Sequence, residues 1–284
     1  MVFLLLASAP FASAAVHQIG PDLYAYISEN DSSSNSTFLV TREGILVVDT
    51  GLNQVEGGKL LAEIRKVSPA PVRYIVNTHY HPDHRGGNGV VGPDAVMITT
   101  DFTRTQMMGK GASPSSLGIA GTNWITFSRA LWLYLGGHEI RIYFPGPAHT
   151  MGDAVVYFPD EHAIATGDLF LTNSCPAMDQ GDLENWIKAL DTILALPVEH
   201  IVPGHFALAG KAELRLFRDY LDALRSQVAE MVRAGRTLEQ VQKGLKLEKY
   251  RGLRQFPKYE ATFADNAAAY FNQLQARDKR HPRP

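Results

Sequence analysis

Four side chains able to bind a metal ion lie within six consecutive positions of this chain. They are His79, His81, Asp83 and His84, and they follow the β-like segment Val72–Val76. Neutral imidazole and carboxylate suit zinc and similar divalent cations. On an extended strand His79 and His81 point to the same side, and a turn after His81 brings Asp83 and His84 to face a second position. This spacing favours two metal ions over one. The alternative is a polar loop that carries histidines by chance.

Three further candidate ligands each follow a short apolar run that ends at or near a glycine. They are His149, Asp168 and His205, preceded by Gly146, Gly167 and Gly204. Each glycine lets the backbone turn sharply and bring a polar side chain into a cleft. Taken singly, each candidate could instead be a capping Asp or a histidine at the edge of the core. Together with the first cluster, they complete two groups of ligands.

These residues, in this order, resemble the metal-binding motifs of the metallo-β-lactamase superfamily, the glyoxalase II-like metallo-hydrolases. The resemblance covers about residues 35 to 205. It implies that one metal is held by His79, His81 and His149, that a second is held by Asp83, His84 and His205, and that Asp168 bridges both. Glyoxalase II and many related hydrolases carry this bridging Asp, whereas zinc β-lactamases of several subclasses carry Cys or Ser there.

A second family-like motif is the run Val47-Val48-Asp49-Thr50-Gly51. In the family, the Asp of this strand-end motif supports the site without binding metal, which makes Asp49 a candidate supporting residue. An Asp that begins a tight turn before Gly51 is an equally good interpretation.

The resemblance also implies a fold, a cofactor and a reaction. The expected fold is α/β, a four-layer αβ/βα sandwich of two mixed β-sheets with outer helices and a helical C-terminal tail. The expected cofactor is two Zn²⁺ per chain, with iron or manganese as alternatives. The expected reaction is hydrolysis, in which a metal-bridging hydroxide attacks the carbonyl centre of an ester, thioester, lactone or β-lactam. Asp83 would be the catalytic residue that orients this water or accepts its proton.

Two other functions stay open on the sequence alone. The first is a persulfide dioxygenase of the same fold, with one iron held by His79, His149 and Asp168. The second is a periplasmic accessory or binding protein with a structural metal and no turnover. The complete second group of ligands, which includes His84 and His205, favours two metals and therefore the hydrolase, because site geometry rather than fold decides function.

The apolar pattern divides the chain into two β-rich halves, each followed by helices. Expected strands cover 23–27, 37–40, 44–48, 72–76, 124–135, 139–144, 154–158 and 163–166, and expected helices cover 57–67, a segment capped by Asp182, and about 214–235. Thr237 and Gln240 form a capping box, and 260–275 is the last expected helix. This order predicts sheet packed on sheet with helices outside. The expected domains are a metal-binding domain at 15–208, C-terminal helices packed on it at 209–276, and a frayed tail at 277–284.

Composition limits the expected partners. The 284 residues carry a net charge of −2, a hydrophobic content of 45% and a single cysteine. This charge offers no basic face for a polyanion, so we expect a small-molecule substrate, no nucleic acid and, in the mature form, no membrane. Because Cys175 is the single cysteine, the chain cannot form an internal disulfide, and we interpret Cys175 as a packing residue. Arg251, Arg254 and Lys258 form a small basic cluster that could meet an acidic substrate or be a solvated face.

Residues 1–14 are expected to be a signal peptide, although no Lys or Arg precedes the apolar run. Met1–Phe11 is short and apolar, and Ala12-Ser13-Ala14 has the small-x-small form that signal peptidases cut. The alternative is a buried first strand. We therefore predict a periplasmic or secreted protein whose mature chain begins at Ala15. Amino-terminal sequencing of the exported protein should read Ala15 first, and an intact Met1 would contradict cleavage.

Overall fold

Two mixed β-sheets face each other in the computed structural model, which describes residues 15–109, 123–254 and 262–280. Among these residues the first sheet has seven strands in chain order, β1 (Ala15–Gln18), β2 (Leu23–Ile27), β3 (Ser36–Thr41), β4 (Gly44–Val48), β5 (Val72–Val76), β6 (Val96–Thr100) and β7 (Trp124–Phe127). The second, in the same described part, has the order β12 (His200–Pro203), β11 (Ala163–Gly167), β10 (Val155–Phe158), β9 (His138–Tyr143) and β8 (Ala130–Leu135). The expected signal peptide and Lys258 lie outside the described residues.

The pairing of neighbouring strands changes once within each sheet, from antiparallel to parallel. Neighbouring strands are antiparallel from β1 to β4 and parallel from β4 to β7. In the second sheet they are antiparallel from β8 to β11, and β12 is parallel to β11. Both sheets are therefore mixed, as predicted. Parallel neighbours end at the same edge of a sheet, which is where polar side chains from different strands can meet.

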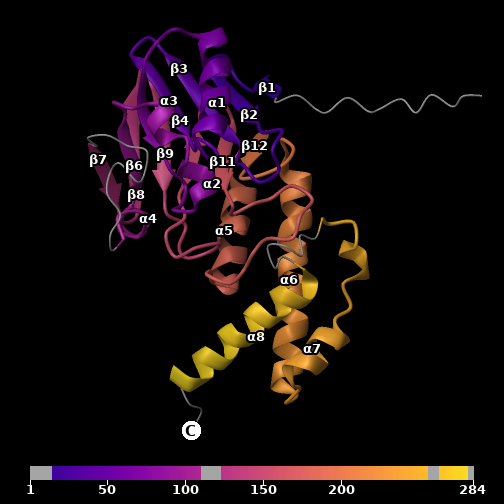
Figure 1. The fold of residues 1–284 in the computed structure, drawn as a ribbon. Coiled ribbons are helices and arrows are strands. Elements are labelled where there is room, and N and C mark those ends of the chain that lie inside the picture. The colour runs from indigo at the N-terminus through magenta and orange to yellow at the C-terminus, as the bar shows by residue number, and fades with distance from the viewer. Residues whose placement is uncertain (1–14, 110–122, 255–261, 281–284) are drawn as a thin grey trace, which may run out of the picture.

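Helices cover the outer face of each sheet, and they give the predicted four-layer α/β sandwich (Figure 1). The first half contributes α1 (Gln54–Val67), α2 (Pro82–Arg85), α3 (Asn88–Val91) and α4 (Asp101–Met107). The second half contributes α5 (Leu183–Ala195), α6 (Lys211–Arg233), α7 (Leu238–Gly244), the 3-10 turn η2 (Glu248–Tyr250) and α8 (Phe263–Arg280). No helix among the described residues is long and apolar enough to cross a membrane.

Strand alternation divides the core into layers. Leu46 and Val48 of β4 belong to the buried cluster between the sheets, whereas Ile45 and Val47 belong to the cluster that contains Leu60 of α1. Successive side chains of a strand point to opposite faces, so one strand supplies both layers. Burying each such aliphatic side chain contributes roughly 1.5–3 kcal/mol.

A third buried cluster joins the second sheet to the C-terminal helices. It contains Ile164 of β11, Trp186 of α5, Phe217 of α6 and Tyr270 of α8. Figure 1 shows α8 lying against α6, away from the sheets. The chain beyond β12 is thus packed onto the same core as the second sheet.

Three local predictions differ from the structure. Residues 124–135 form two strands in different sheets, because β7 pairs with β6 and β8 pairs with β9. Strand β5 ends at Val76, so the histidines after it stand on a loop. The last helix continues to Arg280, and residues 277–280 are helical rather than frayed because Arg277 donates to both carboxylate oxygens of Asp182 at 2.9 and 2.8 Å.

Candidate metal centre

The seven predicted metal ligands all stand on segments that follow the ends of strands. These segments follow β5 for His79, His81, Asp83 and His84, β9 for His149, β11 for Asp168 and β12 for His205. The ligand atoms fall into two groups, each within 4.8 Å, and Asp168 belongs to both. The first group is His79, His81, His149 and Asp168, and the second group is Asp83, His84, Asp168 and His205. The structure therefore brings together every predicted ligand.

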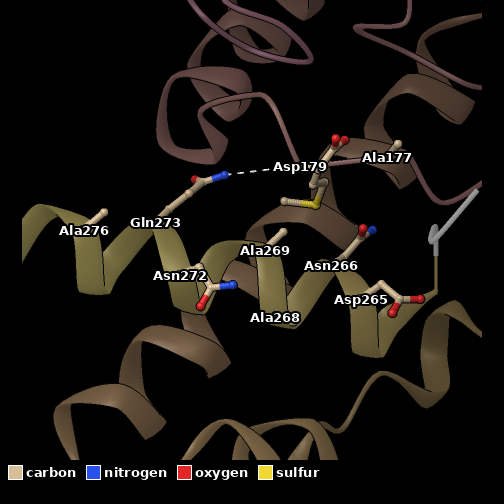
Figure 2. A pocket seen from close by; sticks show the side chains of 10 residues that line it. Ala177, Asp179, Asp265, Asn266, Ala268, Ala269, Asn272, Gln273 and Ala276 are labelled. Carbon is tan, nitrogen blue, oxygen red and sulfur yellow. Dashed lines mark hydrogen bonds between the residues drawn. The ribbon is translucent and has the colours of Figure 1, made fainter.

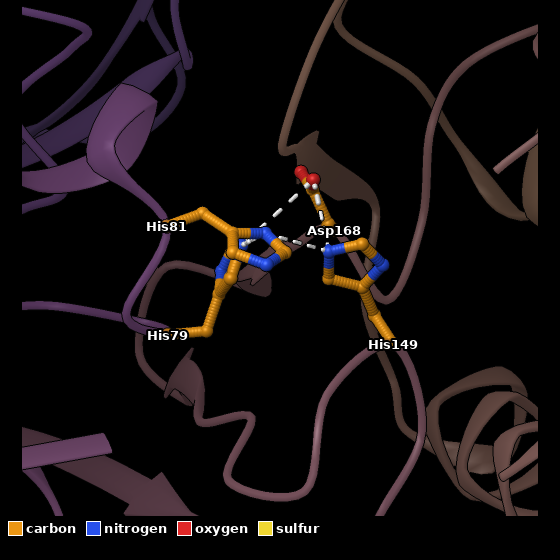
Figure 3. A group of neighbouring side chains, drawn as sticks. All are labelled: His79, His81, His149 and Asp168. Carbon is orange, nitrogen blue, oxygen red and sulfur yellow. Dashed lines mark hydrogen bonds and ion pairs between the residues drawn. The ribbon is translucent and has the colours of Figure 1, made fainter. Parts of the chain in front are cut away.

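The imidazole nitrogens of the first group point toward one another (Figure 3). Nε2 of His79 lies 2.9 Å from Nδ1 of His81, and Nε2 of His149 lies 3.1 Å from the same atom. His79 and His149 are buried, whereas His81 is only half-buried. This group could hold one metal ion. The site would be accessible to a substrate from the side of His81, the half-buried member of the three.

The tautomers of two of these rings follow from their outer partners. The Thr78 hydroxyl donates to Oδ2 of Asp49 at 2.7 Å, so it can only accept from Nδ1–H of His79, at 3.1 Å. Nδ1–H of His149 donates to the carbonyl oxygen of Ala177 at 3.2 Å. A neutral imidazole carries one proton, so Nε2 of each ring is an unprotonated acceptor.

His81 is oriented in the same way. Its Nε2–H donates to Oε1 of Gln180 at 3.1 Å, which leaves Nδ1 unprotonated. Three lone pairs therefore face one another across 2.9 and 3.1 Å, and no proton is available to join them. A divalent cation among them would convert this repulsion into three bonds, since neutral imidazole is a common metal ligand. The donor set of the first group fits a metal ion.

The second group places two imidazole nitrogens against two carboxylates, a donor set that also suits a divalent cation. Nδ1–H of His84 donates to Oδ2 of Asp49 at 2.7 Å, so Nε2 faces the site. Nε2 lies 3.1 Å from Oδ1 of Asp168 and 3.6 Å from Oδ2 of Asp83, while Nε2 of His205 lies 3.2 Å from that same Asp83 oxygen. Nε2 of His84 and Oδ1 of Asp168 are buried without an aligned hydrogen-bond partner among the described residues. Such atoms are costly unless an ion satisfies them.

Burial and charge divide the histidines into two kinds. Burial lowers the pKa of His149 to about 4 and holds the pKa of His79 well below its usual value, so both rings are neutral as metal ligands must be. Burial also opposes the charge on His84 and His205, but Asp168 and the neighbouring carboxylates raise the pKa of both rings. In return, these two histidines overcome the burial of Asp168 and hold its pKa well below the usual range.

Two glycines are required at this edge for physical reasons. Gly167 has a φ of +51°, and a Cβ there would lie 2.4 Å from Oγ1 of Thr78. A Cβ at Gly204 would lie 1.9 Å from Oδ1 of Asp168, the oxygen that faces the second group. Any larger residue at these positions would displace either the support of His79 or the shared carboxylate.

Sequence reasoning missed two residues that orient ligands. Thr78 connects Asp49 to His79, and its place between a strand end and a ligand is a signal that could have found it. Gln180 contacts His81 from a segment about a hundred residues away, and no spacing pattern marks it. Of the predicted basic cluster, Arg254 pairs with Asp31 at 2.6 Å and lies over the ring of Phe206, the residue after His205.

Comparison with known proteins agrees with this geometry. Residues 30–205 match the family model described as the metallo-beta-lactamase superfamily. A metallo-beta-lactamase of Chryseobacterium indologenes is 26% identical over 212 residues, which cover 69% of this chain and 86% of that protein. The alpha subunit of a 2,4-dinitroanisole O-demethylase of Nocardioides sp. is 27% identical over 194 residues, covering 68% of this chain. This chain spans only 58% of that relative's length.

Solved structures show the shared fold. A metallo-beta-lactamase from Pontibacter korlensis gives a TM-score of 0.63 at 24% identity, covering 74% of this chain and 99% of that one. A stereoselective inverting sec-alkylsulfatase from Pseudomonas sp. gives a TM-score of 0.75 at 16% identity, covering 95% of this chain and 52% of that one. Because residues 30–205 make up most of the chain and contain every residue of both groups, this protein belongs to the metallo-beta-lactamase superfamily.

Proposed function

We propose that this protein is a metal-dependent hydrolase that works with two divalent ions, normally zinc. The first group would hold one ion, the second group would hold the other, and Asp168 would bridge them. The observation that carries this proposal is the orientation of the Asp168 carboxylate. Its Oδ2 lies 3.5 Å from Nε2 of His149, whereas its Oδ1 lies 3.1 Å from Nε2 of His84. One oxygen thus faces each group.

The chemistry needs a nucleophile and a proton acceptor. Two divalent ions in such a site lower the pKa of a bound water to near neutrality and polarise the substrate oxygen. Asp83 is the most exposed carboxylate of the site, with 26% of its side chain accessible against 10% for Asp168. We assign to Asp83 the role of orienting the attacking water and accepting its proton. His84 and Asp168 hold the orientation of the site from its buried side.

The substrate class that we propose is a small ester, thioester or lactone. Asp168 stands where the family's zinc β-lactamases of several subclasses carry Cys or Ser, which favours hydrolysis of simpler carbonyl centres over β-lactams. The named relatives act on different bonds, and they include an O-demethylase and a linear primary-alkylsulfatase of Pseudomonas sp. that is 24% identical and covers 72% of this chain. A substrate panel must therefore include a sulfate ester and an aryl ether.

An aromatic side chain contacts the first group, and two exposed apolar side chains lie near it in space or in sequence. The Tyr80 ring lies 4.8 Å from that of His81 and 6.3 Å from that of Phe102. Phe102 and Met151 are two of the few large apolar side chains exposed among the described residues, at 36% and 47%. Met151 follows His149 by two positions. Apolar walls with a few polar groups are typical of small-molecule sites, and these side chains favour a substrate with an apolar group beside the reacting carbonyl.

The two alternatives predict different observations. A mononuclear iron dioxygenase would need the first group alone, but the second group is complete in the structure, with Asp83, His84 and His205 facing a common point. An accessory protein with a structural metal would need no accessible carboxylate at the site, whereas 26% of the Asp83 side chain is accessible. Both features favour the hydrolase.

We expect small ester, thioester or lactone substrates to be hydrolysed fastest by the zinc-loaded protein, and β-lactams slowly. Steady-state kcat/KM values over a panel of these substrates, with a sulfate ester, an aryl ether and a phosphodiester added, measure the order. The net charge of −2 offers no basic surface for a nucleic acid, so phosphodiester cleavage should be absent. Carbapenem turnover orders of magnitude above every ester tested, or efficient phosphodiester cleavage, would show that the substrate assignment is wrong.

A further inference from the structure

One loop, residues 177–182, contacts the metal centre through two different atoms. The carbonyl oxygen of Ala177 accepts Nδ1–H of His149 at 3.2 Å. The side-chain oxygen of Gln180 accepts Nε2–H of His81 at 3.1 Å and also accepts the Tyr80 hydroxyl. These contacts orient two of the three histidines of the first group. The loop has no corresponding contact with the second group among the described residues.

The loop is packed closely onto the turn that carries His149. The backbone N–H of Asp182 donates to the carbonyl oxygen of Ala148 at 3.0 Å. A Cβ at Gly181 would lie 1.7 Å from that same oxygen. The side-chain amide of Asn185 donates to the carbonyl oxygen of Pro147 at 2.9 Å. Movement of the loop would therefore move the turn of His149 with it.

The C-terminal helix α8 holds the loop from its other side. A groove of about 690 Å³ lies between them, lined by Ala177 and Asp179 of the loop and by residues of α8 (Figure 2). Gln273 crosses it, accepting from the backbone N–H of Leu183 at 3.3 Å and donating to the carbonyl oxygen of Met178 at 3.5 Å. Arg277 donates to both carboxylate oxygens of Asp182, at 2.9 and 2.8 Å.

We propose that Gln180 is a positioning residue for the first metal ion and that α8 fixes the loop that presents it. An amide oxygen can only accept, so Gln180 keeps the proton of His81 on Nε2 and the lone pair of Nδ1 toward His79 and His149. The partner of a metal-bound imidazole sets its tautomer, its orientation and its basicity. The inference rests on the two-ion site of the proposed function.

The expected size of the effect follows from exposure. Loss of an outer partner of a metal-bound histidine costs about 10–100-fold in metal affinity. Gln180 is exposed, so water can replace part of its hydrogen bond after truncation. We therefore expect a loss of metal affinity at the lower end of this range, about tenfold, and only for the first ion. Because the side chain is exposed, its truncation should leave folding unchanged.

The test measures zinc affinity at each site separately. His205→Ala removes a ligand of the second group only, and His149→Ala removes a ligand of the first group only. In competition with a chromophoric chelator, Gln180→Ala should weaken zinc binding about tenfold in the His205→Ala background. It should leave zinc binding unchanged in the His149→Ala background. Gln180→Glu keeps an acceptor oxygen and should restore the affinity of the parent.

The role of α8 is tested with a matched pair of remote variants. Arg277→Ala breaks the ion pair to Asp182 and touches neither group of ligands. Arg218→Ala breaks the ion pair between α6 and Asp191 of α5, at 2.8 Å, and the partners described for Arg218 are Asp191, Asp219 and Asp222, none of them in the loop. In the His205→Ala background, the first variant should weaken zinc binding and the second should not.

Equal zinc affinity of Gln180→Ala and its parent in the His205→Ala background would overturn the inference. So would an equal loss in both backgrounds, because that result would mean a general structural effect. The unsubstituted protein is titrated alongside them. If it binds no second ion, the two-ion function fails; if it binds two ions and Gln180→Ala binds them equally well, only the positioning role fails.

Discussion

Replacing Asp168 with alanine is expected to release both metal ions and to reduce hydrolysis by more than about a hundredfold, beyond what loss of an outer partner costs. Asp168 is the only residue shared by the two groups of ligands found among the described residues. Without it, each group keeps three candidate ligands instead of four, and both groups lose the negative charge of the carboxylate that they share. Both ions should therefore bind more weakly, and the pKa of the bound water should rise.

The measurement is zinc content per chain after gel filtration without added metal, together with kcat/KM for the best substrate of the panel. Glu161→Ala is a matched control, because Glu161 is also a buried carboxylate facing a histidine, His138, but lies outside both groups. The control should keep two ions and full activity. Asp168→Ala protein with full activity and an unchanged zinc content would refute the bridging role.

The metal ligands could be predicted because they are local in sequence or follow strand ends. His79 and His81 are an instructive case, since both lie in the first group of candidate ligands but not for the expected reason. The expected alternation along a strand does not apply beyond Val76, where β5 ends. The two rings converge because Asp49 holds Thr78 beside His79, a contact over 29 residues, and because Gln180 contacts His81 over 99 residues. The residue types predict the site, whereas hydrogen bonds between distant segments orient its side chains.

The sequence could not show what depends on distant partners. Gln180 belongs to no recognisable sequence motif. Its hydrogen bond with His81 depends on the position of the loop, which α8 contacts through Gln273. The local pattern predicts an end of the last helix at residue 275, whereas α8 continues to Arg280, because local propensity takes no account of the ion pair between Arg277 and Asp182. Residues 124–135 read as one apolar run, and only the pairing of β7 and β8 with different sheets divides it. The contacts of Gln180 and Arg277 span 99 and 95 residues, and the pairing of β7 with β6 joins residues 27 positions apart, such as Met97 and Trp124.

Replacing Asp49 with alanine is expected to destabilise the metal-free protein by about 3–5 kcal/mol, the usual cost of removing one partner of a buried pair. Asp49 is 2% exposed and accepts from the backbone N–H of Thr78 at 2.9 Å, from the Thr78 hydroxyl at 2.7 Å and from Nδ1–H of His84 at 2.7 Å. Its removal leaves three donors buried without that acceptor. The second ion should also bind more weakly, because Asp49 is the hydrogen-bond partner of Nδ1 of His84 among the described residues.

Urea unfolding of the metal-free protein measures the free-energy change, and zinc titration measures the second effect. Asp49 has a φ of +55°, so part of the cost of alanine, about 1–2 kcal/mol, belongs to the backbone. Asp49→Asn separates the backbone cost from the cost of the lost hydrogen bonds, because asparagine tolerates this conformation and keeps one acceptor oxygen. An intermediate loss of stability in Asp49→Asn is expected. Unchanged unfolding and zinc binding in Asp49→Ala would instead mean that Asp49 only begins the turn before Gly51, the simpler interpretation of its motif, and that His84 is held by the metal alone.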